Sequence, residues 1–276
     1  MRGLIAGLML ALPLSIAGGG IRAGEVTEAE LQALPPSDVV LLGEVHDNPR
    51  HQQLQALAIS AVQPAAVVWE MMTPEQAARL PDDLSDPHVV DESVGWAGRG
   101  WPPLEQYHPI MLAAPQALHL GAEVTRAEAR RVFEAPLARV FTEIFGASAA
   151  HYGLERPLAP DDQASREAHQ AAVHCDALPE HLLPGMVEAQ RLRDGALAHV
   201  ALEALRSTGG PVAVITGGGH ARRDIGMPRK LSIAAPEITV LSLAFLEAEP
   251  GPDAPFDHWL VTDAPEREDP CEAFVD

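Results

Sequence analysis

The chain has 276 residues, enough for one large domain or two small ones. Its formal net charge is −20, from 39 acidic against 19 basic residues, and no lysine- and arginine-rich run of the kind that binds nucleic acids is present. A surface of this charge repels phosphate backbones and is typical of a soluble protein, so we expect no nucleic-acid partner.

The first 23 residues have the pattern of a signal peptide. Arg2 precedes an apolar run over residues 3–17, and small residues follow up to Ala23, a suitable cleavage position. The run is shorter than the roughly 20 apolar residues that a membrane-spanning helix needs. No cysteine directly follows the run as an attachment point for a lipid. We therefore expect cleavage on export and a single periplasmic or secreted domain over residues 24–276.

Six apolar runs, several rich in β-branched residues, predict strands. In chain order they are residues 39–42, 65–69, 118–124, 211–216, 238–246 and 258–262. Between the first two, Asn48 and Pro49 suit the cap and the first position of a helix. A strand, a helix and a strand in succession form a right-handed parallel crossover. The sequence thus predicts an α/β fold with a central, mostly parallel sheet flanked by helices.

Two stretches lack the strand pattern. Residues 126–206 are rich in Ala, Glu, Arg, Gln and His, with apolar residues at helical spacing. They predict a helical insertion between strands of the sheet. Residues 73–117 contain many prolines and the stretch GWAGRGWPPLEQYHPIM, and we expect them to be irregular.

Polar residues follow three of the predicted strands at the point where each ends. Glu44 and His46 follow the first strand, Glu70 follows the second, and His220 follows the fourth after three glycines. Because the carboxyl ends of parallel strands lie at one edge of a sheet, we expect these side chains to face one crevice. Both histidines close a Gly-x-x-His motif, in which glycine lets the backbone turn sharply and approach a ligand.

This set of residues allows more than one interpretation. His46, Glu70 and His220 suit a divalent metal such as zinc or manganese, and a further carboxylate could serve as the general base of a metal-dependent hydrolase. The crevice could instead hold a larger ligand, with these groups as its partners. Taken singly, such residues are more often turn, capping or ion-pair residues. The motifs of serine hydrolases, zincins, thioredoxins and P-loop proteins are absent from the sequence.

Four segments carry a family resemblance: LLGEVHDNPRHQ, VVWEMM, GWPPLEQYHPIM and VITGGGHARRDIGMP. They resemble the ChaN-type haem-binding uptake proteins, whose superfamily includes Tiki and TraB proteins and erythromycin esterase-like enzymes. The resemblance extends over most of the chain after the predicted signal peptide. It implies haem binding during iron acquisition with no turnover, and envelope haem-transport components as partners. Because only 4% of the residues are aromatic, a haem pocket would have to be lined by Met, Leu and Ala or shared across a homodimer.

The resemblance also implies a tyrosine ligand for the haem iron. The sequence contains two tyrosines, Tyr107 and Tyr152, and ferric haem accepts a phenolate. Tyr107 is the favoured ligand, because it lies in a family-like segment beside His108 and near Trp101, on which a porphyrin could pack. The alternative is that Tyr107 is a buried residue whose hydroxyl has a partner.

Further residues are predicted to contact haem. His46, Glu44 and His220 would lie around it at the strand ends. Arg222 follows the second Gly-x-x-His motif and could bind a propionate through charge-assisted hydrogen bonds.

The chain has two cysteines, Cys175 and Cys271. In an oxidising compartment an isolated pair is more often a disulfide than two free thiols, although the residues alone leave both possible. The family resemblance reaches the segments around both cysteines, which supports their pairing.

Overall fold

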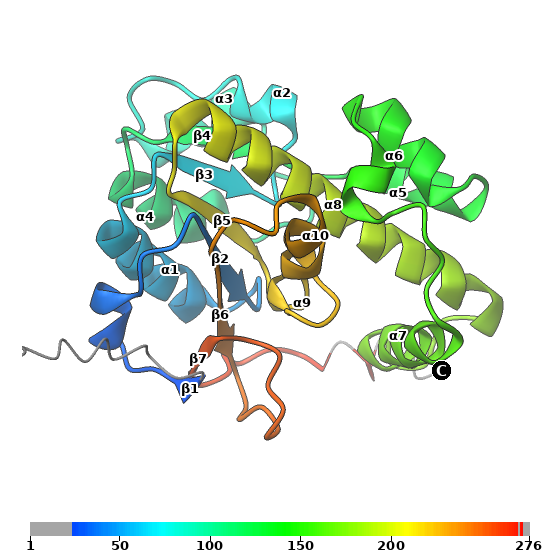
Figure 1. The fold of residues 1–276 in the computed structure, drawn as a ribbon. Helices are drawn as coiled ribbons and strands as arrows, with labels where there is room; N and C mark the ends of the chain where they lie inside the picture. Colours follow the sequence, from blue (N-terminus) through cyan, green and yellow to red (C-terminus); the bar gives the residue numbers. More distant parts are fainter. Residues whose placement is uncertain (1–23, 270, 273–276) are drawn as a thin grey trace, which may run out of the picture.

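The structure, a computed structural model, describes residues 24–269 and 271–272. The predicted signal peptide lies outside the described residues. Seven described strands form one fully parallel sheet in the order β1-β7-β6-β2-β5-β3-β4 (Figure 1). The strands are β1 (Gly24–Glu25), β2 (Val39–Glu44), β3 (Ala66–Trp69), β4 (Leu118–Gly121), β5 (Val212–Gly217), β6 (Val240–Leu246) and β7 (His258–Val261).

Helices cover both faces of this sheet. The α-helices are α1 (Pro49–Val62), α2 (Pro74–Ala77), α3 (Pro87–Val94), α4 (Leu104–Ala113), α5 (Arg126–Arg130), α6 (Leu137–Phe145), α7 (Pro160–Val173), α8 (Leu183–Thr208), α9 (Gly218–Ala221) and α10 (Met227–Ala234). Short 3-10 helices are η1 (Glu30–Ala33), η2 (Arg131–Phe133), η3 (Ala149–Tyr152) and η4 (Glu180–Leu182). None of the described helices is long and apolar enough to cross a membrane.

The predicted α/β class and the parallel sheet are confirmed, as is each of the six predicted strands. Strand β1 was not predicted, because its two residues are too few to form an apolar run. Asn48 caps α1 as predicted, since its side chain accepts a hydrogen bond from the Arg50 amide at 3.0 Å.

The prediction that residues 73–117 are irregular is wrong, because this stretch contains α2, α3 and α4. Two of its prolines begin helices, and a third, Pro109, lies inside α4. Pro74 and Pro87 stand in the first turns of α2 and α3, where no helical hydrogen bond of the proline nitrogen is lost. Thr73 and Asp86 cap the same two helices.

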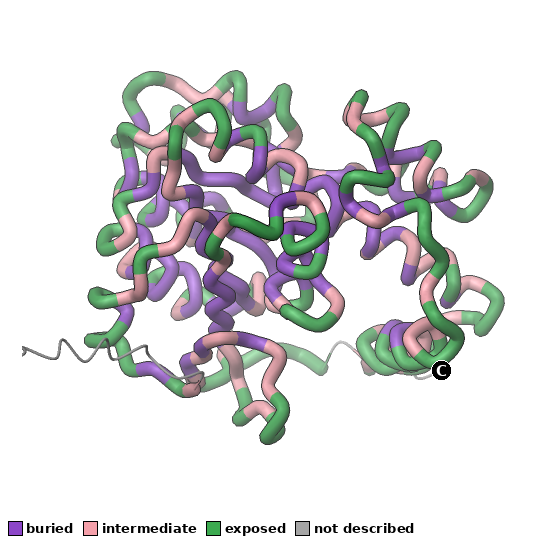
Figure 2. The backbone as a smooth tube through the Cα atoms, viewed as in Figure 1, coloured by how far each residue is buried: buried purple, intermediate pink, exposed green. Residues whose placement is uncertain are grey.

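The sheet has a hydrophobic core on each face, and successive residues of one strand alternate between the two cores. Leu41, Val68 and Val214 lie in the core beneath α8, whereas Leu42 and Ile215 lie in the core with α1 and α4. Strands covered on both sides read as continuous apolar runs, which is why the sequence pattern showed them clearly. Figure 2 shows the buried strands inside a more exposed outer layer of helices.

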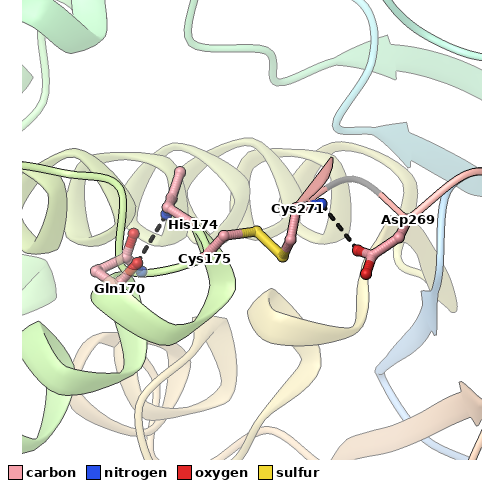
Figure 3. The surroundings of a disulfide bond; sticks show 5 residues. All are labelled: Gln170, His174, Cys175, Asp269 and Cys271. Atoms are coloured by element: carbon pink, nitrogen blue, oxygen red, sulfur yellow. Dashed lines mark hydrogen bonds between the residues drawn. A yellow bond between two sulfur atoms is a disulfide. The ribbon is translucent and has the colours of Figure 1, made fainter. Parts of the chain in front are cut away.

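The predicted helical insertion is confirmed: α5, α6, α7 and α8 follow one another between β4 and β5. Helix α8 is 26 residues long and packs on the sheet over β3 and β5. The rest of the insertion packs against its other end (Figure 1). The predicted disulfide is also present. It joins Cys175, just after α7, to Cys271 in the carboxyl-terminal tail (Figure 3).

Strand order determines which strand ends meet. β5 lies between β2 and β3 although it comes long after both in the sequence. Glu44 at the end of β2 pairs with Gly217 at the end of β5, and Trp69 at the end of β3 pairs with Ile215. β2 and β5 therefore end level with each other, whereas β3 ends two residues earlier, so that Glu70, the next residue, lies beside the last residues of β5.

Candidate functional site

Four predicted side chains come together at the ends of β2, β3 and β5: Glu44, His46, Glu70 and His220, which we call the strand-end cluster. His220 Nε2 lies 3.4 Å from Glu70 Oε1. A Cβ atom placed on Gly217 would lie 2.9 Å from His46 Nε2 and 3.7 Å from Glu70 Oε2. The structure thus brings together residues from three separate parts of the sequence.

Glu44 is the centre of one half of the cluster. Its Oε1 accepts hydrogen bonds from His46 Nδ1 and from the Tyr107 hydroxyl, both at 2.7 Å. Its Oε2 accepts a hydrogen bond from Gln52 Nε2 at 2.8 Å. Burial raises the pKa of Glu44 above its ordinary value, although these three donors oppose the shift. Burial opposes protonation of His46, yet Glu44 and Glu70 together raise the pKa of its imidazole.

Glu70 is the centre of the other half. Its Oε2 accepts hydrogen bonds from the Thr216 hydroxyl at 2.6 Å and the Gly217 amide at 2.7 Å. Burial alone would raise the pKa of Glu70, but His220 and the other donors hold it well below its usual range. His220 Nδ1 donates to Asp194 Oδ1 at 2.7 Å. Burial works against its charge, but Glu70 and Asp194 raise the pKa of His220 to about 10.

Access to the cluster is through His46, whose side chain is 31 % exposed while Glu44 and His220 are buried. The Trp101 ring meets the His46 ring edge-on, with centroids 4.9 Å apart. His46, oriented from behind by Glu44, can therefore exchange a proton with a ligand at this edge. Trp101 offers an aromatic surface beside it.

Tyr107 lies inside the core and has no exposed surface. Its ring packs against Trp96 and Trp69, with centroids 5.2 Å and 6.4 Å away. Burial and the neighbouring Glu44 carboxylate raise the pKa of Tyr107 far above its ordinary value. Its position matches the alternative interpretation of a buried tyrosine with a bonded hydroxyl. Iron ligation by Tyr107 would require this hydroxyl to leave Glu44 and the tryptophan packing to open.

Two other predicted haem contacts have partners of their own. His108 is buried, and its Nε2 donates to the Leu84 carbonyl at 2.7 Å. Arg222 donates to both carboxylate oxygens of Asp224, at 3.0 Å and 2.7 Å. In the part of the chain that the structure describes, neither residue has a polar contact with the strand-end cluster.

The proposed metal ligands His46, Glu70 and His220 do not form a ligand set. Within residues 24–269 and 271–272, no group of three or more His, Cys, Asp and Glu side chains is arranged to hold a metal ion. The ring nitrogens of His220 face Asp194 and Glu70, and Glu70 Oε2 accepts two hydrogen bonds. The zinc or manganese alternative therefore has no support in this geometry.

A second location contains the other tyrosine. Between η3 and the carboxyl-terminal half of α8 lies an open hollow of about 580 Å³, which we call the Tyr152 hollow. The Tyr152 hydroxyl lies 3.0 Å from His199 Nδ1, and burial raises the pKa of this phenol to about 12. The hollow is lined by Ala147, Ser148, Ala150, His151, Tyr152, His199, Glu203 and Arg206.

The sequence did not reveal Gln52 and Asp194 as parts of the strand-end cluster. Gln52 donates a hydrogen bond to Glu44, and Asp194 accepts one from His220. Gln52 lies on the buried face of α1, and Asp194 on the buried face of α8. A polar residue at an inward position of an amphipathic helix would have been the available signal, because such a residue needs a partner. That signal appears only when the inward face of each helix is known.

Comparisons with solved structures show similarity to a structure entitled "Cofacial heme binding to ChaN of Campylobacter jejuni". The identity is 18%, the match covers 83% of this chain and 89% of that chain, and the TM-score is 0.64. The type III effector HopBA1 (14% identity, 82% and 88% covered, TM-score 0.38) and the erythromycin esterase mutant EreC in its open conformation (13%, 84% and 78%, TM-score 0.42) also match. At 18% identity, the first match shows that the two proteins share a fold. The TM-scores of the other two matches are too low to show a shared fold.

No curated protein matches the chain. A family model does match, over residues 31–231, and it is described as "Haem-binding uptake, Tiki superfamily, ChaN". This range includes the strand-end cluster and the Tyr152 hollow. The chain therefore belongs to the ChaN family of haem-binding uptake proteins within the Tiki superfamily.

Proposed function

We propose that this protein binds haem in the Tyr152 hollow and carries it during iron acquisition, without chemical turnover. One observation supports this location above others: both tyrosine rings are buried, but Tyr152 lines an open hollow, whereas Tyr107 lines neither this hollow nor the Arg166-lined cavity beside α7 and α8. The volume of about 580 Å³ is within the range of small-molecule sites.

The chemistry of the lining suits ferric haem. Tyr152 and the imidazoles of His151 and His199 are groups that ligate haem iron. The phenol of Tyr152 keeps its proton at neutral pH, because its pKa is about 12. His199 Nδ1, 3.0 Å from the hydroxyl, is placed to accept this proton when iron takes its place. Arg206 can bind a propionate through charge-assisted hydrogen bonds.

The rival location is the edge of the strand-end cluster at His46 and Trp101. There Tyr107 would be the ligand, and Glu44 and His220 would stand behind it. This alternative requires a rearrangement of the core around Tyr107, as described above. The metal-dependent hydrolase has no comparable support, because the described residues contain no group arranged to hold a metal ion.

The setting of this activity is also part of the proposal. We infer a periplasmic or secreted protein that passes haem to transport components of the envelope. The disulfide between Cys175 and Cys271 is compatible with an oxidising compartment. The similar Campylobacter structure is described as binding haem cofacially. A haem in an open hollow has one face free, so a second haem-loaded copy could stack on it and form a homodimer.

Titration of the purified protein with haemin tests the proposal. We expect an absorbance band shifted from that of free haemin and saturating at a fixed stoichiometry. Tyr152→Phe and Tyr107→Phe form a matched pair, since each deletes one phenolic hydroxyl from a buried ring. Tyr152→Phe should change the spectrum and weaken haem binding about tenfold or more. Tyr107→Phe should leave the spectrum unchanged and lower stability by about 1–3 kcal/mol, because the buried Glu44 loses a donor.

The variants separate the two locations. A spectrum altered by Tyr107→Phe and unaltered by Tyr152→Phe would move the haem site to the strand-end cluster. If the wild-type protein produced no shifted band, haem carriage itself would be the wrong function.

A further inference from the structure

Three buried cationic side chains meet where α7, α8 and α10 pack together. They are Arg166 on α7, Arg191 on α8 and Lys230 on α10, with 8 %, 3 % and 4 % of their surfaces exposed. Buried cations are normally paired with carboxylates, because loss of hydration is costly. This chain carries 39 acidic residues, so a lack of carboxylate partners for these three buried cations is unexpected.

Of the three, Arg191 has the most partners in the protein, although its Nε is buried and unpaired. Arg191 donates to Glu188 and to the Arg156 carbonyl, both at 2.7 Å. Arg166 has no hydrogen-bond or ion-pair partner among the described residues, and its Nε is buried and unpaired. Burial lowers the pKa of Lys230 to about 8. The Asp194 carboxylate opposes this shift, and the nearby arginines add to it. Positive charge at this place is therefore incompletely neutralised.

The buried carboxylate that attracts both Arg166 and Lys230 is already engaged. Asp194 faces both Arg166 and Lys230, but its Oδ1 accepts the hydrogen bond of His220 Nδ1. Asp162, one turn before Arg166 on α7, is partly exposed. Neither acid forms an ion pair with Arg166 among the described residues.

A cavity opens beside the unpaired guanidinium. It has a volume of about 40 Å³, and its polar lining is Arg166, His169, Gln170, Gln190, Asp194 and His220. One water needs about 10–15 Å³ of such space, so the cavity admits a small polar group. A carboxylate group is smaller than a phosphate and fits this space better.

We propose that this cavity, the Arg166 cavity, binds the carboxylate of a small acidic ligand, with Arg166 as its main donor. A carboxylate there would supply the acceptor that Arg166 lacks. The cavity shares no lining residue with the Tyr152 hollow, so this site is independent of the proposed haem site.

The test uses haem-free full-length protein and acetate as the probe, with chloride at equal ionic strength as the reference. Acetate should raise the melting temperature saturably and give saturation-transfer NMR signals. Arg166→Gln should weaken acetate binding about tenfold or more, since it removes a charge-assisted donor. Arg139→Gln, which alters an arginine side chain that is 64 % exposed, should bind acetate like the wild type.

A second measurement distinguishes a ligand site from a structural arginine. Without acetate, Arg166→Gln should melt at the wild-type temperature or above it, because the variant lacks an unpaired buried cation. A lower melting temperature together with unaltered acetate binding would overturn the proposal. Absence of saturable acetate binding would also overturn it. Phosphate should bind at least tenfold more weakly than acetate, and equal or tighter phosphate binding would contradict the carboxylate assignment.

Discussion

The space that a side chain would fill at Gly217 is occupied by the imidazole of His46. A Cβ atom there would lie 2.9 Å from His46 Nε2, closer than real Cβ contacts. Its φ is −63°, so glycine is needed for this close approach and not for an unusual backbone conformation. The glycine of the second Gly-x-x-His motif thus makes room for the histidine of the first.

We therefore expect Gly217→Ala to displace the His46 ring and lower stability by about 1–3 kcal/mol, the usual range for overpacking. Histidine NMR signals and urea unfolding measure the two effects. Gly219→Ala is the matched control, because a Cβ atom at Gly219 meets nothing within 4 Å. Equal effects of the two variants would show that the His46 contact is not the reason for glycine at position 217.

His51 has an environment that admits only a neutral ring. Its Nδ1 accepts the Val45 amide at 2.9 Å, and its Nε2 donates to the Thr262 hydroxyl at 2.9 Å. The residue has no exposed surface, and burial lowers its pKa to about 4. If Nδ1 of His51 were protonated, its N–H would face the N–H of the Val45 amide, and neither donor would have an acceptor there.

Acid should therefore destabilise the fold through His51. Below about pH 6.5 the unfolded chain binds a proton at this residue and the folded chain does not, so stability falls as the pH drops to about 4. The loss attributable to His51 is at most about 3 kcal/mol. Denaturant unfolding of wild type and His51→Gln at several pH values from 4 to 7 measures it as a difference in slope. Parallel curves for the two proteins would contradict this assignment.

At the scale of elements, the disulfide ties the helical insertion to the tail that follows β7. The cysteines are 96 residues apart in sequence, and the enclosed segment includes α8, β5 and β6. A crosslink that closes a long loop restricts the unfolded chain and so stabilises the folded one. It also anchors the end of α7, the helix that carries Arg166.

Replacing both cysteines by serine should lower the free energy of unfolding by about 2–5 kcal/mol. A reducing agent should bring the wild-type protein to the stability of the double variant and leave the double variant unchanged. Thiol labelling of the unfolded, unreduced wild type should find no free thiol. Two labelled cysteines would contradict the disulfide.

Helix α1 shows a difference between sequence pattern and packing at the same scale. The apolar spacing indicated an inward face, but the buried residues of α1 also include His51, Gln52 and Gln55. Gln55 donates to the Leu42 carbonyl at 2.9 Å, and Gln52 donates to Glu44. The polar side of this helix therefore supports the strand ends instead of facing solvent.

At the scale of the whole molecule, we expect the exported protein to begin near residue 24. Cleavage there leaves β1 intact, which pairs with β7 at the edge of the sheet. N-terminal sequencing of periplasmic protein checks this expectation. An exported sample that retained Met1 would contradict it.

The sequence by itself determined six of the seven described strands, the start of α1 and the edge of the sheet at which Glu44, His46, Glu70 and His220 would lie. These features depend on local backbone preferences and on burial patterns repeated along short segments. A helix cap such as Asn48 acts on the next two residues, so it can be read without any knowledge of distant contacts.

Only the tertiary structure decided the strand order and the environment of each tyrosine. Both tyrosines lie in helical segments, but one packs between tryptophans and donates to Glu44, whereas the other lines an open hollow. Likewise, Asp194 is recognisable as the partner of His220 only when α8 has been packed onto the sheet. Such partners are far apart in sequence, and their meeting depends on the sum of many packing contacts, which no local pattern contains.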